Sequence, residues 1–222
     1  MFYDFLTILF RPAAWWGRME VEGLENVPVD GPLLVVPNHD SQWDPILAAL
    51  AIKPVRRLRF LAKASLFRWP LVGPILYAAG QIPIKRGQQD SVALEKAIEV
   101  LQAENAICIF PEGRLSWGEH LRARTGVARL AQWCENVQIV LCTIEGATDY
   151  ARFPRRPRVK VTFLRPAAGD PQPGEEAPVL ATRLLDEIRD HVAPAPAGRR
   201  ARVGGPPRVR KRLASRSRAS RS

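Results

Sequence analysis

Short apolar runs alternate with helical patterns over most of this chain, and that alternation restricts its fold more than any other feature. The runs lie between turn residues, as buried strands do. They occupy residues 33–36, 58–61, 106–110, 138–142 and 159–163, and the helical patterns occupy residues 44–52, 90–101, 121–133 and 179–191. Strands that alternate with helices predict an α/β fold, a single domain with a largely parallel central sheet flanked by helices.

Positive charge is concentrated at the end of the chain. The sequence holds 33 lysines and arginines against 22 aspartates and glutamates, a net charge of +11. Residues 193–222 contain 10 of these cations and no acidic residue, so residues 1–192 carry a net charge of only +1. With so few apolar residues, 193–222 cannot form a core, and we expect a disordered basic tail. Such a tail binds any polyanion, which leaves anionic lipid and nucleic acid as alternatives.

The start of the chain is rich in aromatic residues. Residues 2–16 are apolar almost all round, so this segment either packs on the domain or lies in a membrane interface. We assign residues 1–18 to an aromatic membrane-interface segment and residues 19–192 to the folded domain. No apolar run approaches the roughly 20 residues of a membrane span. Asp4 and Arg11 flank the apolar stretch against the pattern of a signal peptide, so we do not expect export.

The three cysteines, Cys108, Cys134 and Cys142, lie in apolar surroundings and lack the spacing of a metal site. We interpret them as reduced core residues. The sequence shows no other metal-ligand cluster, so it predicts neither a metal nor a cofactor.

The first candidate site lies where a buried strand gives way to a helix, between Asn38 and Asp44. In open α/β sheets, ligands bind outside the carboxyl ends of strands. His39 can act as a general base near neutral pH, and Asp44 is placed to hold its tautomer and stabilise the imidazolium. The alternative is structural, with Asp44 as the N-cap of the helix and His39 as a hydrogen-bonded loop residue.

Two further strand ends carry charged residues. Glu112 and Gly113 follow the strand at 106–110, and Arg86 follows a short apolar run at 81–84. A guanidinium matches phosphate oxygens bidentately, so Arg86 is the candidate phosphate clamp. Alone, each of these segments fits a solvated loop. Together they place a base, an acid and a phosphate-binding cation at successive strand ends.

In this order, the motifs resemble those of the glycerolipid acyltransferase family, the 1-acylglycerol-3-phosphate acyltransferases. The matching segments are 22–28, Asn38-His39 with Asp44, 83–87, 110–113 and the apolar strand 137–143. The resemblance extends from about Val21 to Pro166. It implies transfer of an acyl group from acyl-CoA or acyl carrier protein to the hydroxyl of a lysophospholipid, 1-acylglycerol-3-phosphate, at a membrane surface.

The resemblance also implies roles for individual residues. The family's catalytic pair corresponds to His39 and Asp44. Its phosphate-associated arginine corresponds to Arg86, and the glutamate and glycine of its third motif correspond to Glu112 and Gly113. Arg124 corresponds to a further anion contact. The third motif departs from the family's usual Thr-Arg-Ser, because this chain has Arg114-Leu115-Ser116, and the role of Arg114 is therefore open.

The implied chemistry agrees with the residue types. A thioester is already activated, so the reaction needs a base near the acceptor hydroxyl and polar groups near the developing oxyanion. No serine elbow or cysteine–histidine arrangement occurs in the sequence, which favours direct attack over a covalent acyl-enzyme. We expect a peripheral enzyme on the cytoplasmic side of the cell membrane. The alternatives are an acyltransferase for another lysophospholipid or a glycolipid, and a non-catalytic polyanion-binding protein that acts through its tail. A primary nucleic-acid function is not expected, because the body carries no nucleic-acid-binding motif.

Overall fold

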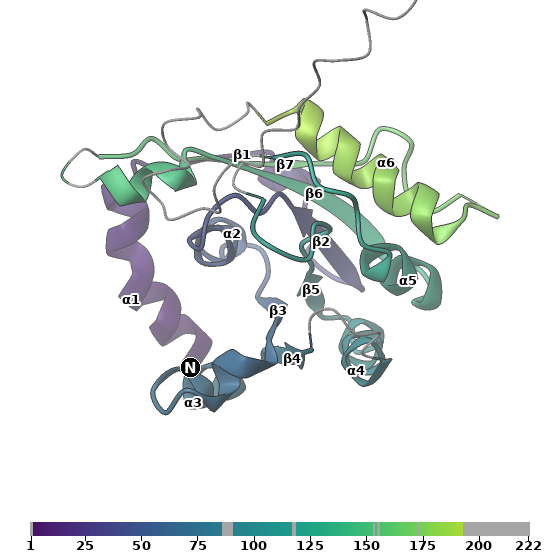
Figure 1. Ribbon diagram of the computed structural model, residues 1–222, viewed down its shortest axis with the longest axis horizontal. Coiled ribbons are helices and arrows are strands. Elements are labelled where there is room, and N and C mark those ends of the chain that lie inside the picture. The colour runs from purple at the N-terminus through teal and green to yellow at the C-terminus, as the bar shows by residue number, and fades with distance from the viewer. Residues whose placement is uncertain are drawn as a thin grey trace, which may run out of the picture.

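A seven-stranded, largely parallel sheet forms the centre of the molecule, with helices on both faces (Figure 1). The computed structural model describes residues 2–85, 91–116, 119–152, 154, 156–172 and 174–192. The strand order is β1-β7-β6-β2-β5-β3-β4, and neighbouring strands are parallel except for the antiparallel pair β6 and β7. The strands are β1 (Glu20–Glu22), β2 (Leu33–Pro37), β3 (Leu58–Lys63), β4 (Ile82–Ile84), β5 (Ala106–Cys108), β6 (Gln138–Glu145) and β7 (Lys160–Leu164). The predicted fold class is thereby confirmed.

Six α-helices occur among the described residues. They are α1 (Phe2–Trp16), α2 (Asp44–Ile52), α3 (Val72–Ala78), α4 (Ser91–Gln102), α5 (Gly126–Trp133) and α6 (Ala177–Asp190). Three short 3₁₀ segments, η1 (Leu24–Asn26), η2 (Ala64–Arg68) and η3 (Ala147–Arg152), lie between the larger elements.

The core has two layers, one on each face of the sheet, and β2 contributes to both. Leu34 and Val36 pack with α4, α5 and α6 on one face. Leu33 and Val35 pack with α2 on the other face. All four side chains are fully buried, which explains why β2 is a continuous apolar run rather than an alternating one. The loop that follows β2 therefore starts from a strand that is buried on both faces.

Helix α1 packs against α2 on the outer side of the domain (Figure 1). Asp4, in its first turn, forms an ion pair with Lys53 at 2.8 Å. At its other end, Nε of Arg156 donates a hydrogen bond to the carbonyl oxygen of Trp16 at 3.1 Å. The N-terminal segment is thus a helix attached to the domain at both ends.

Most of the predicted elements are present, but one helix is shorter than its sequence pattern suggests. The patterns at 44–52, 90–101 and 179–191 correspond to α2, α4 and α6. The prediction of a helix over 121–133 is wrong in its first part, because α5 begins at Gly126. The backbone N–H of Arg124 instead binds the carbonyl oxygen of Pro111 at 2.7 Å, which ties this stretch to the loop after β5. The sequence analysis missed β1 and α3.

Candidate active site

The loops that follow β2 and β5 meet at the carboxyl edge of the sheet. The two strands are parallel neighbours with Val35 opposite Cys108, so the segments that follow them leave the sheet together. The loop after β2 carries His39, and the loop after β5 carries Glu112. Both side chains are buried, with exposed fractions of 6% and 2%. The structure therefore brings together the first and third motifs of the sequence.

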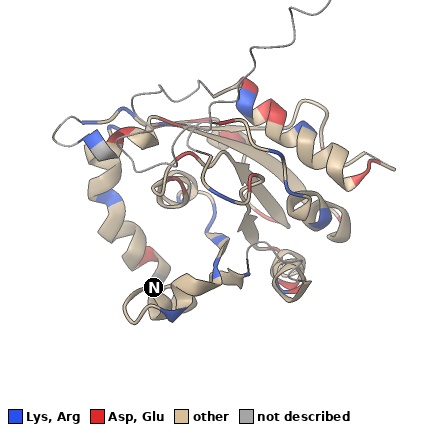
Figure 2. Ribbon diagram, in the orientation of Figure 1, with Lys and Arg blue, Asp and Glu red and all other residues tan. Residues whose placement is uncertain are grey.

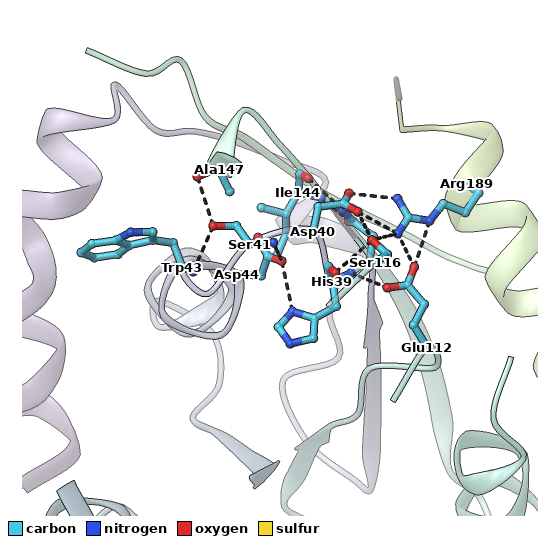
Figure 3. Close-up of polar contacts among 11 residues, drawn as sticks. His39, Asp40, Ser41, Trp43, Asp44, Glu112, Ser116, Ile144, Ala147 and Arg189 are labelled. Atoms are coloured by element: carbon cyan, nitrogen blue, oxygen red, sulfur yellow. Dashed lines mark hydrogen bonds and ion pairs between the residues drawn. The ribbon is translucent and has the colours of Figure 1, made fainter. Parts of the chain in front are cut away.

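His39 and Asp44 face each other at the start of α2 (Figure 3). Nδ1 of His39 lies 3.2 Å from Oδ2 of Asp44, and the same oxygen accepts a hydrogen bond from the backbone N–H of Ser41 at 2.7 Å. Asp44 is the first residue of α2, and Trp43 occupies the N-cap position. The interpretation of Asp44 as the helix N-cap is wrong, because its carboxylate binds loop residues that precede the helix.

Asp44 is a buried carboxylate, and only one of its two oxygens is hydrogen-bonded within the described part of the chain. The side chain is completely buried, and its Oδ1 makes no hydrogen bond to any described residue. Burial raises the pKa of this carboxyl, and the hydrogen bonds from His39 and Ser41 only partly oppose that effect. An uncompensated buried carboxylate is costly, so it gains stability when a cation forms beside it. The hydrogen bonds from His39 and Ser41 are therefore the described contacts that compensate the carboxylate of Asp44.

The imidazole of His39 is held by its face as well as by Nδ1. Phe110 stacks on the ring, with the two ring centroids 4.0 Å apart. The second nitrogen, Nε2, points away from Asp44 (Figure 3) and makes no hydrogen bond to a residue that the structure describes. Nε2 is consequently the nitrogen that can meet a substrate.

The loop after β5 holds the main chain of His39 from two sides. Oε2 of Glu112 accepts a hydrogen bond from the backbone N–H of His39 at 3.1 Å. The backbone N–H of Ser116 donates to the carbonyl oxygen of His39 at 2.7 Å, and the Ser116 hydroxyl lies 3.0 Å from the same oxygen. Glu112 thus acts on the backbone of the candidate base, which the sequence could not indicate.

An arginine that the sequence analysis missed completes this cluster. Arg189, near the end of α6, places its guanidinium between Asp40 and Glu112 (Figure 3). Nη1 and Nη2 each donate to one oxygen of Asp40 at 2.9 Å, and Nε donates to Oε1 of Glu112 at 2.9 Å. Nη2 also contacts Oε1 of Glu112, and it donates to the hydroxyl of Ser116 at 2.8 Å. Arg189 belongs to no sequence motif, and its sequence context is that of an ordinary arginine in an amphipathic helix.

One guanidinium compensates two buried carboxylates in this cluster, and it does so unequally. Burial would raise the pKa of Asp40, but the hydrogen bonds and charge of Arg189, with hydrogen bonds from Ser116 and Asn38, outweigh burial and lower it. Burial also acts on Glu112, and there it outweighs the attraction of Arg189, so the pKa of Glu112 is raised. Asp40 and Glu112 therefore share one guanidinium, which binds both carboxylates directly.

The serines nearest to His39 are engaged in structural hydrogen bonds. The hydroxyl of Ser41 donates to the carbonyl oxygen of Ala147 at 3.2 Å and accepts from the backbone N–H of Trp43 at 3.2 Å. The hydroxyl of Ser116 contacts Asp40 and the carbonyl oxygen of His39. No hydrogen bond joins either hydroxyl to an imidazole nitrogen among the described residues.

The cysteines do not offer a nucleophile either. Cys108, Cys134 and Cys142 are unpaired and buried, which confirms their interpretation as reduced core residues. Burial raises the pKa of both the Cys108 and the Cys142 thiol, which keeps these groups protonated and unreactive.

The remaining residues singled out in the sequence lie at different distances from this cluster. Gly113 has φ of +67°, and a Cβ at this position would lie 3.0 Å from Cγ of Arg124, so these two predicted residues are neighbours. Arg124 and Arg114 are both exposed. Arg86 lies outside the described residues. The last described strand before it, β4, is separated from β2 by β5 and β3.

The described part of the chain contains neither a cluster of metal ligands nor a helix that could span a membrane. No three histidine, cysteine, aspartate or glutamate side chains are grouped there as a metal ion would require. Within the same residues, no helix combines the length and the apolar character needed to cross a bilayer.

Comparisons with known proteins agree on one family. A family model described as Acyltransferase matches residues 18–145. A lyso-ornithine lipid O-acyltransferase of Pseudomonas aeruginosa is 41% identical over 131 residues, which cover 55% of this chain and 49% of that protein. A 1-acyl-sn-glycerol-3-phosphate acyltransferase of Streptococcus pneumoniae is 28% identical over 170 residues, which cover 75% of this chain and 62% of that protein. The chain thus spans about half to three-fifths of the length of these relatives.

A solved structure has the same fold. The crystal structure of the 1-acyl-sn-glycerophosphate acyltransferase PlsC from Thermotoga maritima matches with a TM-score of 0.69 at 23% identity, covering 85% of this chain and 77% of that chain. Helix α6 and its Arg189 lie beyond the residues that the family model matches.

Proposed function

The chain belongs to the acyltransferase family, and on that premise we propose that it transfers an acyl group from a thioester donor to a hydroxyl group of a lysolipid, with His39 as the base. One observation carries the proposal. Nδ1 of His39 is paired with a buried carboxylate, whereas Nε2 makes no bond within the described residues. A base for an acceptor hydroxyl requires this arrangement, in which one nitrogen is fixed and the other is left for the substrate.

The steps follow from the two nitrogens of His39. Asp44 accepts the Nδ1–H hydrogen bond, so the lone pair lies on Nε2. Nε2 takes the proton of the acceptor hydroxyl as the hydroxyl oxygen attacks the thioester carbonyl carbon. When the tetrahedral intermediate collapses, the C–S bond breaks and the imidazolium returns the proton to the leaving sulfur. The products are an ester and a free thiol, and His39 is neutral again. Asp44 stabilises the imidazolium between the two proton transfers.

Direct transfer is preferred over a covalent acyl-enzyme because no nucleophile among the described residues is paired with His39. The hydroxyls of Ser41 and Ser116 are held by structural hydrogen bonds, as described above. A nucleophilic serine would require its hydroxyl within hydrogen-bond reach of the base. The acceptor hydroxyl supplies the nucleophile in its place.

The acceptor proposed first is 1-acylglycerol-3-phosphate. Relatives named for this acceptor include the Streptococcus pneumoniae protein and a Bos taurus protein that is 31% identical over 175 residues. Arg86, which corresponds to the family's phosphate-associated arginine, supplies the guanidinium for such a headgroup. The donor is acyl-CoA or acyl carrier protein.

A second acceptor, a lyso-ornithine lipid, is favoured by one specific observation. The relative from Pseudomonas aeruginosa that carries this name is 41% identical to the chain over 131 residues, against 28% over 170 residues for the relative from Streptococcus pneumoniae. An ornithine headgroup offers no phosphate for Arg86 to bind, so only 1-acylglycerol-3-phosphate requires this guanidinium.

A panel assay separates these acceptors. The purified full chain is supplied with acyl-CoA or acyl carrier protein and with 1-acylglycerol-3-phosphate, lyso-ornithine lipid or lysophosphatidylcholine, and kcat/KM is measured for each pair. We expect the highest value with 1-acylglycerol-3-phosphate, and we expect Arg86→Ala to raise KM about 10-fold for this acceptor and to leave KM for the phosphate-free lyso-ornithine lipid unchanged. A higher value with lyso-ornithine lipid would support the second candidate. Transfer to none of the acceptors from either donor would contradict the proposed function.

A lipid acceptor requires the enzyme to reach a membrane surface, and the outer face of α1 suits this purpose. Phe5, Ile8, Leu9 and Trp15 are between 57% and 71% exposed, and their spacing places them on one side of the helix. Figure 2 shows little charge along α1, where Asp4 and Arg11 are the charged residues. We propose that this face inserts shallowly into the interface on the cytoplasmic side of the cell membrane. The basic segment 193–222, which lies outside the described residues, would add attraction to anionic lipid.

A further inference from the structure

Arg189 reaches the site from a distant part of the chain. It is 149 residues from Asp40, to which it donates two hydrogen bonds, and its side chain is only 10% exposed. Burying a guanidinium is costly unless its donors are satisfied. Here Nε, Nη1 and Nη2 all have acceptors, on Asp40, Glu112 and Ser116. The chain therefore fixes this cation in one position and orientation.

The partners of Arg189 are the groups that hold the backbone of the candidate base. Glu112 accepts the N–H of His39 with one oxygen and contacts Arg189 with the other. Ser116 binds the carbonyl oxygen of His39 through its backbone N–H and accepts a hydrogen bond from Arg189 at its hydroxyl. No hydrogen bond joins Arg189 itself to the imidazole among the described residues. Its effect on the ring must therefore pass through the main chain of His39.

We propose that Arg189 is a positioning residue for His39. Its guanidinium fixes the positions of Glu112 and Ser116. These two residues bind the backbone N–H and the carbonyl oxygen of His39, and this fixes Nε2 relative to the acceptor hydroxyl. The inference rests on the proposed function, because only a base needs its Nε2 placed in this way. A displacement of about 1 Å of a catalytic group is enough to lower turnover substantially.

The geometry requires an arginine rather than any cation. Asp40 takes two parallel hydrogen bonds from Nη1 and Nη2, which orients the planar guanidinium so that Nε is directed at Glu112. A lysine ammonium is a point charge without this fixed fork, so it can compensate the carboxylates without setting their relative positions. Arg189→Lys therefore keeps the positive charge and removes the fixed geometry of the guanidinium.

The same helix offers a matched control. Arg183 forms a bidentate pair with Glu175, at 2.9 Å and 3.0 Å, and within the described part of the chain it makes no contact with the site. Its side chain is 21% exposed, so its pair is less buried than that of Arg189. Arg183→Lys makes the same chemical change on α6 away from His39.

The test combines kinetics with hydrogen exchange of the resting enzyme. Steady-state kcat and KM are measured for the full chain, for Arg189→Lys and for Arg183→Lys with the best acceptor of the panel. Amide exchange of His39 and Ser116 is followed without substrate. We expect Arg189→Lys to lower kcat about 10-fold with KM within threefold, and to speed exchange of the His39 amide at least 10-fold. Arg183→Lys should change each quantity by less than twofold.

The outcomes separate this inference from the proposed function. Arg189→Lys with wild-type kcat and wild-type exchange at His39 would overturn the positioning role and leave Arg189 as an anchor of α6. A rise in KM alone would also overturn it, since it would indicate substrate contact. If Arg189→Lys speeds amide exchange at His39 but the full chain acylates no acceptor, the link between Arg189 and the backbone of His39 stands and the proposed function is rejected. The double variant Asp40→Asn with Arg189→Gln buries less unpaired charge, and it should reproduce the fast exchange at His39 if the lysine variant is unstable.

Discussion

The carboxyl edge of the sheet and the outer face of α1 differ in the burial and in the polarity of their side chains. At the edge, His39, Asp44 and Glu112 are buried, and the hydrogen bonds of this cluster join three different parts of the chain. On α1, large apolar side chains such as Phe5 and Trp15 are exposed, and the helix is attached through contacts near its two ends. The first region is rigid and polar, and the second is open and apolar.

The difference suggests a division of work. Buried hydrogen bonds fix the direction of an imidazole, which chemistry at a hydroxyl requires. Exposed apolar side chains gain free energy when they leave water, which a lipid surface provides. If this division is correct, changes at the edge lower turnover on every acceptor, whereas changes on α1 lower only the activity that depends on a bilayer.

The largest effect is expected at His39. His39→Ala should lower kcat by about 100-fold or more, because general-base catalysis contributes on that scale, while the fold remains intact. The measurement is the initial rate at saturating substrates, with circular dichroism to check folding. His191→Ala, an exposed histidine just after α6, is the matched control and should stay within twofold. A folded His39→Ala enzyme with near wild-type turnover would contradict the mechanism.

Asp44→Asn should have the next largest effect, lowering kcat about 10- to 100-fold. The amide has no negative charge to stabilise the imidazolium. The amide oxygen of asparagine can still accept the backbone N–H of Ser41, so the free energy of unfolding should fall by no more than about 1 kcal/mol. Urea unfolding alongside kinetics checks both parts. A large loss of stability with unchanged turnover would make Asp44 a structural residue.

A smaller effect, limited to membranes, is expected on α1. Phe5→Ser with Leu9→Ser should weaken vesicle binding about 10-fold. Two apolar side chains that are partly buried in the membrane interface contribute a binding free energy of roughly that size. Transfer to a short-chain acceptor below its critical micelle concentration should be unchanged. Trp133→Ser with Val179→Ser removes exposed apolar side chains elsewhere and serves as the control in vesicle sedimentation. Equal losses in both double variants would remove the special role of α1.

The smallest effect is expected from the basic tail. Deleting residues 194–222 should weaken binding to anionic vesicles several-fold at low ionic strength and hardly at all at high salt, because screening shortens the range of the attraction. Binding to neutral vesicles should be unaffected. If the truncated protein binds anionic vesicles at low salt as well as the full chain does, the tail is not a membrane anchor, and another polyanion becomes its better partner.

The two regions also differ in how far the sequence predicts them. His39 and Asp44 are five residues apart between a strand and a helix, so local patterns are enough to place them together. Glu112 follows the neighbouring strand β5, and the carboxyl ends of parallel strands share one edge of the sheet. The composition of residues 2–16 shows that α1 is apolar, but only the structure shows that one face packs on α2 and leaves the other exposed.

Arg189 could not be predicted, because nothing in its neighbourhood distinguishes it from Arg183 on the same helix. Its role depends on where α6 crosses the carboxyl edge, and that is decided by the packing of Leu180, Leu184 and Ile188 in the core. The prediction of a helix over 121–133 is wrong in its first part for a similar reason. There a backbone hydrogen bond to the loop after β5 overrides the helical preference of the sequence.

The account's central claim is that His39 activates the hydroxyl of the acceptor rather than a nucleophile of the enzyme. It is tested most directly by mixing the full chain with its thioester donor in the absence of acceptor, and by following thiol release and the intact mass of the protein. The account predicts no thiol release stoichiometric with enzyme and no mass increase, and rapid thiol release once acceptor is added. A burst of one thiol per enzyme, with the mass of one acyl group added to the protein, would contradict it.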